Sequence, residues 1–155
     1  MKDFFNTPAR LAALRAEAAK WIGTPWVPNS ASPGVGVSCH HLPRSIYVAC
    51  GALPPGFPIV VGDPAEGRYA KISRMESFND SRKEFKRLAL DDLQHDIQPG
   101  DLLGIRIYHC IDHLGVALEE GLFIHVLMHK HTDFDMRGVA PWSQRIEAAW
   151  RIVED

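Results

Sequence analysis

The sequence has no long apolar run, few cysteines and no excess of one sign of charge. No stretch approaches the roughly 20 consecutive apolar residues of a membrane-spanning helix, and the first residues, MKDFFNTPARLAALRAEAAKW, lack the apolar segment of a signal peptide. We therefore expect synthesis in the cytoplasm and no membrane partner. The 17 basic and 19 acidic residues leave a formal charge of −2 without a basic block, which argues against a nucleic-acid partner.

The three cysteines are Cys39, Cys50 and Cys110. Their number is odd and no secretory signal precedes them, so we expect free thiols rather than a disulfide framework. A chain of 155 residues with 46% hydrophobic content is long enough for one packed core and short for two. We therefore expect one domain over residues 1–155, in which the chemistry of the thiols matters more than any bridge. The oligomeric state is left open.

The first third of the chain has the pattern of two helices. Thr7 is a good N-cap and is followed by a proline suited to the first helical position, which predicts a helix over residues 8–22. A second helix begins at Cys39 or later, because Pro43 has to lie in its first turn, and it ends at about Cys50, ahead of a glycine. The segment between the helices is rich in Pro, Gly and Ser and predicts a loop that leads to Cys39.

The remainder of the chain changes from irregular segments to strands. Residues 52–70 predict an irregular connection, and residues 74–93 predict a polar, partly helical stretch. Beyond residue 96, short apolar runs separated by turn signals predict four strands, at 102–108, 113–118, 122–128 and 145–153. A helical part followed by a meander of strands is typical of the α+β class.

The short connection EEG between two of these strands determines on which face of the sheet two histidine side chains lie. A three-residue hairpin loop commonly has a type I turn followed by a left-handed residue, and Gly121 stands at that position. This loop pairs Leu118 with Leu122, so His113 and His125 point to the same face of the sheet. They are diagonal neighbours, roughly 7–8 Å apart at the backbone, which is within reach of a side-chain hydrogen bond.

A cysteine and two histidines are the side chains that a cysteine hydrolase needs. Such an enzyme uses a thiolate nucleophile, an imidazole that moves protons, and a third polar group that orients the imidazole. Cys39, His113 and His125 supply one candidate for each role. A thiol at a helix N-terminus is favoured as thiolate by the unpaired backbone N–H groups, and those groups can also stabilise an oxyanion.

Four segments together resemble a known family. The segments GVSCHHL, QPGDLLGI, DHLGVALEEGLFIHV and WSQRIEAAWRI look like the NlpC-type cell-wall cysteine peptidases, particularly their single-domain branch associated with phage tails. The resemblance extends from about Ala18 to Ile152. Each segment alone is common, whereas the ordered set is specific.

The resemblance implies a papain-like α+β fold, in which the helix that carries the nucleophile packs on an antiparallel sheet. By the same likeness Cys39 would be the nucleophile, His113 the general base and acid, and His125 the residue that orients it. The partner would be a peptidoglycan stem peptide or muropeptide, cleaved between γ-D-glutamate and the diamino acid, with no metal or organic cofactor. Without a signal peptide, such an enzyme would reach the cell wall in a phage particle or by another non-classical route.

The residues around the candidate nucleophile depart from the family pattern. The family usually has Asp before the cysteine and a small pair after it, whereas here these positions hold Ser38, His40 and His41. Trp26 stands where the family often has a tyrosine that donates a hydrogen bond near the oxyanion. We therefore take Trp26, Ser38 and His40 as candidate substrate-binding or oxyanion residues.

Three other functions stay open at this point. An amidase or acyltransferase could use the same cysteine and histidines, because a fold and a triad do not fix the acyl donor. An inactive member of the fold could bind cell-wall fragments. A zinc or copper site could draw on Cys39 with His40 and His41, on the segment HCIDH, and on His125, His129 and His131, although the sequence has neither an HExxH motif nor paired CxxC motifs.

The remaining cysteine, histidine and tryptophan candidates have simpler expected roles. Cys50 lies on the apolar stripe of the second helix and is expected to be buried. Trp142 and Trp150 are expected to pack against the sheet. Surface or loop positions are expected for four histidines: His95, His109, His129 and His131.

Overall fold

The computed structural model describes residues 1–60, 72–89, 91, 95–107 and 109–155. Its helices are α1 (Pro8–Trp21), α2 (His41–Ala49), α4 (Arg74–Ser81), α5 (Trp142–Arg145) and a 3₁₀ turn, η2 (Glu119–Gly121). Its strands are β1 (Lys2–Asp3), β2 (Ala31–Ser32), β3 (Gly36–Val37), β4 (Phe85–Arg87), β5 (Leu102–Ile107), β6 (Cys110–Ala117), β7 (Leu122–His125), β8 (Asp133–Met136) and β9 (Ile146–Glu154). No helix in these ranges is long and apolar enough to cross a membrane.

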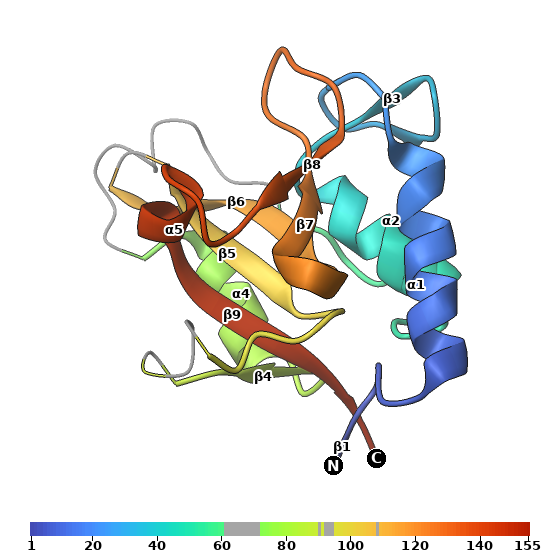
Figure 1. Ribbon diagram of the computed structural model, residues 1–155, viewed down its shortest axis with the longest axis vertical. Helices are drawn as coiled ribbons and strands as arrows, with labels where there is room; N and C mark the ends of the chain where they lie inside the picture. Colours follow the sequence, from blue (N-terminus) through green and yellow to red (C-terminus); the bar gives the residue numbers. More distant parts are fainter. Residues whose placement is uncertain (61–71, 90, 92–94, 108) are drawn as a thin grey trace.

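Seven strands form one antiparallel sheet in the order β1-β9-β5-β6-β7-β8, with β4 also paired to β9. A larger apolar cluster joins buried side chains of α1, α2 and α4 to one face of the sheet. A smaller cluster, which includes Leu103, Ile105 and Phe123, covers the other face with Trp142 of α5 against it. Figure 1 shows α1 and α2 together on one side of the sheet and α5 near its far end. The expected α+β fold is confirmed.

Helix α1 forms where the sequence predicts it. The Thr7 side chain accepts a hydrogen bond from the Arg10 N–H, and proline occupies the first turn. Leu14, Ala18 and Trp21 are its buried residues. Gly23, with a φ of +83°, follows the helix in a conformation that other residues avoid. Local capping and one apolar face are therefore sufficient to define this helix.

The predicted strands differ from the structure at four places, and part of the middle region lies outside the described residues. Residues 74–93 contain helix α4, as expected of a partly helical stretch, and residues 85–87 form strand β4, which was not predicted. Residues 61–71, 90 and 92–94 of the middle region lie outside the described residues. Strand β8 was not predicted, because its sequence DFDM is short and polar. Strand β6 begins at Cys110, three residues before the predicted start, and β7 ends at His125.

The hairpin between β6 and β7 has the predicted register but a different turn. Val116 pairs with Ile124, and Ala117 pairs with Phe123, which is the register that sets Leu118 opposite Leu122. The prediction of a type I turn is wrong, because Glu120 also has a left-handed backbone, with a φ of 60°. The loop length determines the register, so the error in turn type leaves the facing of the histidines unchanged.

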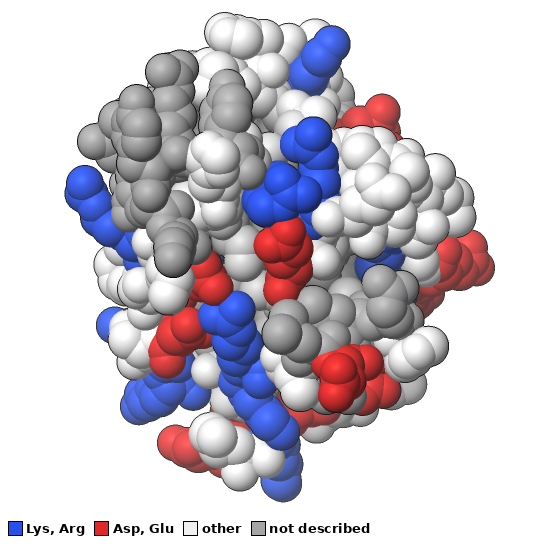
Figure 2. Space-filling model, turned by 90° about the vertical axis from the view of Figure 1, so that its left-hand side faces the viewer, with Lys and Arg blue, Asp and Glu red and all other residues white. Residues whose placement is uncertain are grey.

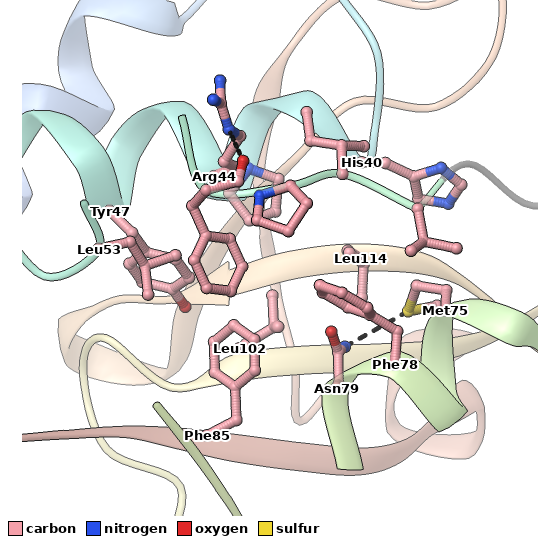
Figure 3. A pocket seen from close by; sticks show the side chains of 15 residues that line it. His40, Arg44, Tyr47, Leu53, Met75, Phe78, Asn79, Phe85, Leu102 and Leu114 are labelled. Atoms are coloured by element: carbon pink, nitrogen blue, oxygen red, sulfur yellow. Dashed lines mark hydrogen bonds between the residues drawn. The ribbon is translucent and has the colours of Figure 1, made fainter. Parts of the chain in front are cut away.

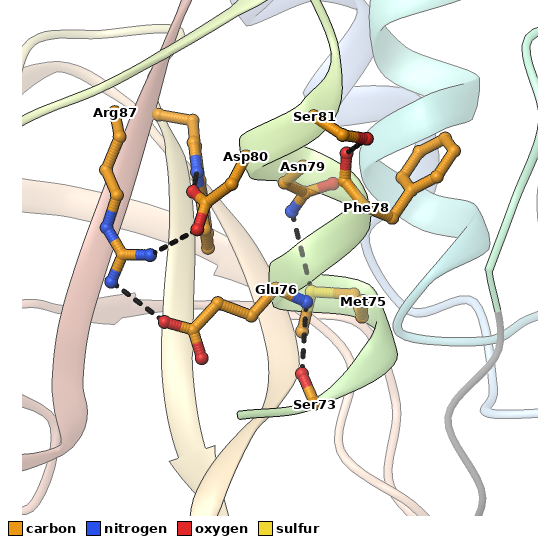
Figure 4. Close-up of polar contacts among 9 residues, drawn as sticks. Ser73, Met75, Glu76, Phe78, Asn79, Asp80, Ser81 and Arg87 are labelled. Carbon is orange, nitrogen blue, oxygen red and sulfur yellow. Dashed lines mark hydrogen bonds and ion pairs between the residues drawn. The ribbon is translucent and has the colours of Figure 1, made fainter. Parts of the chain in front are cut away.

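Helix α4 is attached to the sheet by a polar cluster. Arg87 of β4 donates to Glu76 and to Asp80 of α4, each over 2.8 Å. The indole N–H of the buried Trp150 donates to the other oxygen of Asp80, also over 2.8 Å. Figure 4 shows Arg87 between the two carboxylates. These bonds hold α4 against β4 and β9 and so fix the position of α4 relative to the sheet.

The face on the side of α4 and β4 carries charges of both signs. Figure 2 shows Lys and Arg side chains next to Asp and Glu side chains across this face. Neighbouring charges of opposite sign cancel much of each other's field, and salt in water screens the remainder. On this face, therefore, neither sign builds the continuous potential that attracts a polyanion.

The PGD turn before β5 joins three parts of the fold. The Tyr47 hydroxyl of α2 donates to the carbonyl oxygen of Gly100 over 2.9 Å. The buried carboxylate of Asp101 accepts from the Gln98 N–H and from the guanidinium of Arg151 on β9. Gly100 has a φ of +96°, and a Cβ atom there would lie 2.2 Å from the Phe5 ring. This position therefore excludes a side chain for two independent reasons.

Alanine substitutions at three glycines should rank in stability by these reasons. Gly100→Ala is expected to lower the melting temperature most, because it adds a clash to left-handed strain. Gly121→Ala, where a Cβ meets nothing within 4 Å but φ is +75°, should cost the strain alone, about 1–2 kcal/mol or several degrees. Gly138→Ala, which has open space and no left-handed φ, is the matched control and should melt like wild type. Wild-type melting of Gly100→Ala would contradict this account of the turn.

Candidate active site

The two predicted sheet histidines meet directly. His113 of β6 and His125 of β7 are buried, and the Nε2 atom of His113 lies 2.8 Å from the Nδ1 atom of His125. His113 pairs with Ile105 across β5, so both imidazoles lie on the sheet face that carries the smaller apolar cluster. The hairpin register alone brings them together, as the sequence predicted.

Asp135 extends this pair and was missed by the sequence reasoning. Its Oδ2 atom lies 2.7 Å from the Nε2 atom of His125. Strand β8 pairs His125 with Asp133 and Phe123 with Asp135, so Asp135 is a diagonal neighbour of His125. The available signal was the alternation of two aspartates in TDFDM, which places both on one face if the segment is read as a strand.

The carboxylate of Asp135 determines which ring nitrogens carry protons. An ionised carboxylate only accepts hydrogen bonds, so Nε2 of His125 is the donor. In a neutral His125 the Nδ1 atom is then an acceptor, and Nε2 of His113 has to donate to it. The Nδ1 atom of His113 is left with its lone pair, which makes it the basic atom of the series.

Burial keeps both imidazoles neutral. Burial, the charge of His125 and the charge of His40 hold the pKa of His113 well below its ordinary 6.5. Burial also lowers the pKa of His125, although the hydrogen bond and charge of Asp135 oppose this. Phe123 and Trp142 contact the His125 ring at centroid distances of 4.6 and 4.7 Å and exclude water from it.

Cys39 lies in a helical turn that leads into α2. The Leu42 N–H donates to the Ser38 carbonyl, and the Ser38 hydroxyl accepts from the His41 N–H at 3.3 Å. These are the bonds of a capped helix start. Pro43 has no N–H, so it occupies the first turn without losing a bond. Cys39 is half-buried and lies just before α2, whose N-cap is His40, which agrees with the predicted helix start at Cys39 or later.

His40 is not on the surface but between this turn and the sheet. Its side chain is buried, and its Nε2 atom lies 3.0 Å from the Asp112 carbonyl oxygen of β6. His40, which follows Cys39 directly in the chain, therefore ties this turn to the residue that precedes His113. No hydrogen bond joins Cys39 directly to His113 within the described residues.

Ser38 and Trp26 make contacts of other kinds. The Ser38 hydroxyl accepts the His41 backbone N–H at the start of the helical turn and also lies 2.6 Å from the Nδ1 atom of the His41 ring. Trp26 donates its backbone N–H to the Lys130 carbonyl. The centroid of its ring lies 5.5 Å from the centroid of the exposed His129 ring. A role for either residue in substrate or oxyanion binding stays a prediction.

The other cysteines differ from Cys39. Cys110 is buried, and burial, with the charge of Glu17, raises the pKa of the half-buried Cys50 to about 11. All described cysteines are free thiols, as expected. The four histidines expected at the surface are exposed: His95, His109, His129 and His131.

The side chains proposed for a metal site do not converge. Within the described ranges, no group of three or more His, Cys, Asp and Glu side chains is arranged to hold a metal ion. The Nε2 atom of His113 and the Nδ1 atom of His125 are hydrogen-bonded to each other, and the Nε2 atom of His125 is bonded to Asp135, so these three nitrogens already have partners. The geometry therefore gives no support to the zinc or copper hypothesis.

An apolar pocket lies beside the turn that carries Cys39. It is a cavity of about 40 Å³ between α2, α4 and the sheet, with His40, Met75 and Leu114 among its lining residues. Figure 3 shows His40 at one end of this pocket. Arg44 closes another side, where its Nε atom donates to the Phe57 carbonyl over 2.6 Å. A substrate at Cys39 would have an apolar wall on this side.

The buried His113 gives a testable dependence of stability on pH. Its pKa is lower in the folded protein than the 6.5 of an exposed histidine, so below pH 6.5 the unfolded chain binds more protons at this site. The stability gained from neutral His113 is therefore present above pH 6.5 and lost as the pH falls, by at most about 1.4 kcal/mol per pH unit. The difference in unfolding free energy between wild type and His113→Asn should shrink from about pH 7.5 to about pH 5.5.

Urea unfolding at both pH values measures this difference. His131→Asn, which changes an exposed histidine, is the control and should show the same difference from wild type at both. A difference for His113→Asn that grew on acidification would contradict the neutral, buried state of His113.

Comparison with known proteins identifies the fold but not close relatives. No protein-family model and no curated protein matches the sequence. Solved structures do match. An NLP/P60-family protein from Staphylococcus aureus, described as similar to lipoprotein, matches 96% of this chain and 43% of its own, with a TM-score of 0.66 and 18% identity.

Two peptidoglycan hydrolases are similar as well. The NlpC/p60 domain of SagA matches 93% of this chain and 98% of its own, with a TM-score of 0.56 and 20% identity. RipB from Mycobacterium tuberculosis matches 95% of this chain and 66% of its own, with a TM-score of 0.56 and 14% identity. The chain thus spans less than half of the staphylococcal protein but nearly all of the SagA domain. It has the papain-like α+β fold of the NlpC/P60 proteins.

Proposed function

We propose that this protein is a cysteine peptidase that cleaves peptidoglycan stem peptides between γ-D-glutamate and the diamino acid. The observation that carries the proposal is the buried series His113–His125–Asp135, which leaves one basic nitrogen on His113 in a chain whose free Cys39 stands just before helix α2. The fold supports the substrate class, since SagA and RipB are described as peptidoglycan hydrolases. The phage-tail branch, the cytoplasmic synthesis and the single domain stay predictions.

The first half of the reaction is acyl transfer to sulfur. Nδ1 of His113 takes the proton of the Cys39 thiol, and the sulfur attacks the carbonyl carbon of the scissile amide. The C–N bond then breaks as His113 gives this proton to the nitrogen, which leaves as the amine of the diamino acid. The backbone N–H groups of Cys39 and His40 are available to the oxyanion, because neither donates to a group in the part of the chain that the structure describes. Cys39 needs no direct hydrogen bond to His113 at rest, since such bonds often tighten only when substrate binds.

The second half is hydrolysis of the thioester. The Nδ1 lone pair of His113 takes a proton from the attacking water, and the C–S bond breaks to release the γ-glutamyl acid. The positive charge on His113 is then shared along its hydrogen bond with His125 and faces the Asp135 carboxylate. His125 and Asp135 act through His113 and position it.

A defined tetrapeptide muropeptide tests the nucleophile. Cys39→Ala should lower the cleavage rate by at least about 1,000-fold, as measured by mass spectrometry of the products. Cys50→Ala, which removes the thiol at the other end of α2, should keep wild-type activity. Equal activity in wild type and Cys39→Ala would refute the mechanism. If cleavage depends on Cys39 but occurs at a different amide, the protein is an amidase and not the proposed peptidase. If the muropeptide stays intact in every sample, the protein is an inactive binding domain.

Substitutions along the histidine series should lower kcat in a graded way. His113→Ala should cost most and His125→Ala less, while Asp135→Asn should cost roughly 10–100-fold with little change in KM, because it frees His125 without touching substrate. Asp133→Asn is the matched control on the same strand. It removes a carboxylate charge that also acts on His125, but Asp133 is exposed and its carboxylate accepts from the Phe134 N–H, whereas Asp135 is the residue bonded to the His125 ring. A rise in KM with unchanged kcat in Asp135→Asn would contradict a positioning role.

A further inference from the structure

A buried hydrogen bond of His40 links the turn that bears Cys39 to strand β6. His40 is only 9% exposed, and its Nε2 atom lies 3.0 Å from the carbonyl oxygen of Asp112, the residue before His113. A carbonyl oxygen only accepts hydrogen bonds, so Nε2 of His40 carries the hydrogen that is donated. The bond joins the residue after the candidate nucleophile to the residue before the candidate base, although 72 positions separate them in the sequence.

The bond from His40 ends on an irregularity of the sheet. Ile105 of β5 pairs with His113 of β6, and the next residue of β5, Arg106, pairs with Ile111. Asp112 is therefore an extra residue on β6, which is the arrangement of a β-bulge. A bulge bends its strand and changes the direction of the side chains beside it. The geometry of this bulge thus determines where the His113 ring points.

Other hydrogen bonds of the turn remain close to it in the chain. The Leu42 N–H donates to the Ser38 carbonyl, and the Ser38 N–H donates to the Ser30 carbonyl of the preceding loop. These bonds shape the turn itself, whereas the bond from His40 reaches the large sheet. The His40 ring also lines the apolar pocket together with Met75 and Leu114. An apolar side chain of similar size would therefore still pack at this position without making the bond.

We propose that His40 is a positioning residue, whose bond to the bulge at Asp112 fixes the turn of Cys39 relative to the ring of His113. The inference rests on the proposed function, in which these two side chains exchange a proton. His40 itself transfers no proton in this account and acts through the backbone of its two neighbours. The histidine that stands where the family pattern has a small residue then supports the reaction.

Two substitutions at His40 separate the hydrogen bond from the packing. His40→Leu keeps an apolar side chain in the pocket but has no donor, and it should lower kcat on the muropeptide about tenfold with little change in KM. His40→Gln offers an amide N–H to the same carbonyl and should recover most of the rate. His41→Gln is the matched control, because the His41 ring bonds to Ser38 within the turn. Equal losses in His40→Leu and His40→Gln would overturn the inference.

A double-mutant cycle shows whether His40 acts through His113. In wild type, His40→Leu should cost about tenfold in kcat, whereas in a His113→Ala background the same change should cost less than about twofold. The reason is that a turn aligned with a ring has nothing to lose once that ring is absent. A full tenfold loss in both backgrounds would show a general effect on the fold and would contradict a positioning role.

Hydrogen exchange of the amides in residues 38–42, measured by mass spectrometry, needs no substrate. The exchange should be about tenfold faster in His40→Leu than in wild type, because the turn has lost its bond to the sheet, and nearly unchanged in His40→Gln. Equal exchange in all three proteins would overturn the inference. A wild type that leaves the muropeptide intact would refute the peptidase, and fast exchange confined to His40→Leu would still show that His40 fixes the turn to β6.

Discussion

The hydrogen bond between His125 and the Asp135 carboxylate is the constraint on which the site depends. A carboxylate accepts and does not donate, so this one contact orders the protons on two buried imidazoles and leaves a lone pair at Nδ1 of His113. The sheet makes the contact possible, because the registers of β6 with β7 and of β7 with β8 place the three side chains as diagonal neighbours. A shift of one residue in either pairing would turn one of them to the opposite face.

The site contains two imidazoles in opposite states, and their acceptors explain the difference. His113 is buried with another imidazole as its hydrogen-bond partner, so its direct partner carries no negative charge that would offset the burial of a cation, and its pKa is lowered. His40 is also buried, but its Nε2 atom faces the carbonyl and the carboxylate of Asp112, and its interactions with Cys39 and Asp112 outweigh burial and raise its pKa to about 9. The apolar pocket beside His40 adds a dry wall at this place.

Local signals in the sequence were enough for α1, for the start of α2 and for the β6–β7 hairpin, because caps, a first-turn proline and loop length act within a few residues. The facing of His113 and His125 followed from that loop length alone. Strands β4 and β8 were missed because their sequences are short and polar, and they become strands only through pairing with β9 and β7. Asp135 was missed with β8. The role of His40 could not be read locally either, since its burial and tautomer depend on Asp112, which is distant in the sequence.

The most direct test of the central claim is the protonation state of the His113 ring, measured by ¹⁵N NMR of labelled histidine at neutral pH in wild type and in Asp135→Asn. The account predicts a neutral His113 in wild type, with the hydrogen on Nε2 and a bare Nδ1, and a mixture of tautomers once the carboxylate is gone. A wild-type His113 that carries its hydrogen on Nδ1, or that is an imidazolium at neutral pH, would contradict the account, because no basic nitrogen would then remain for the proposed chemistry.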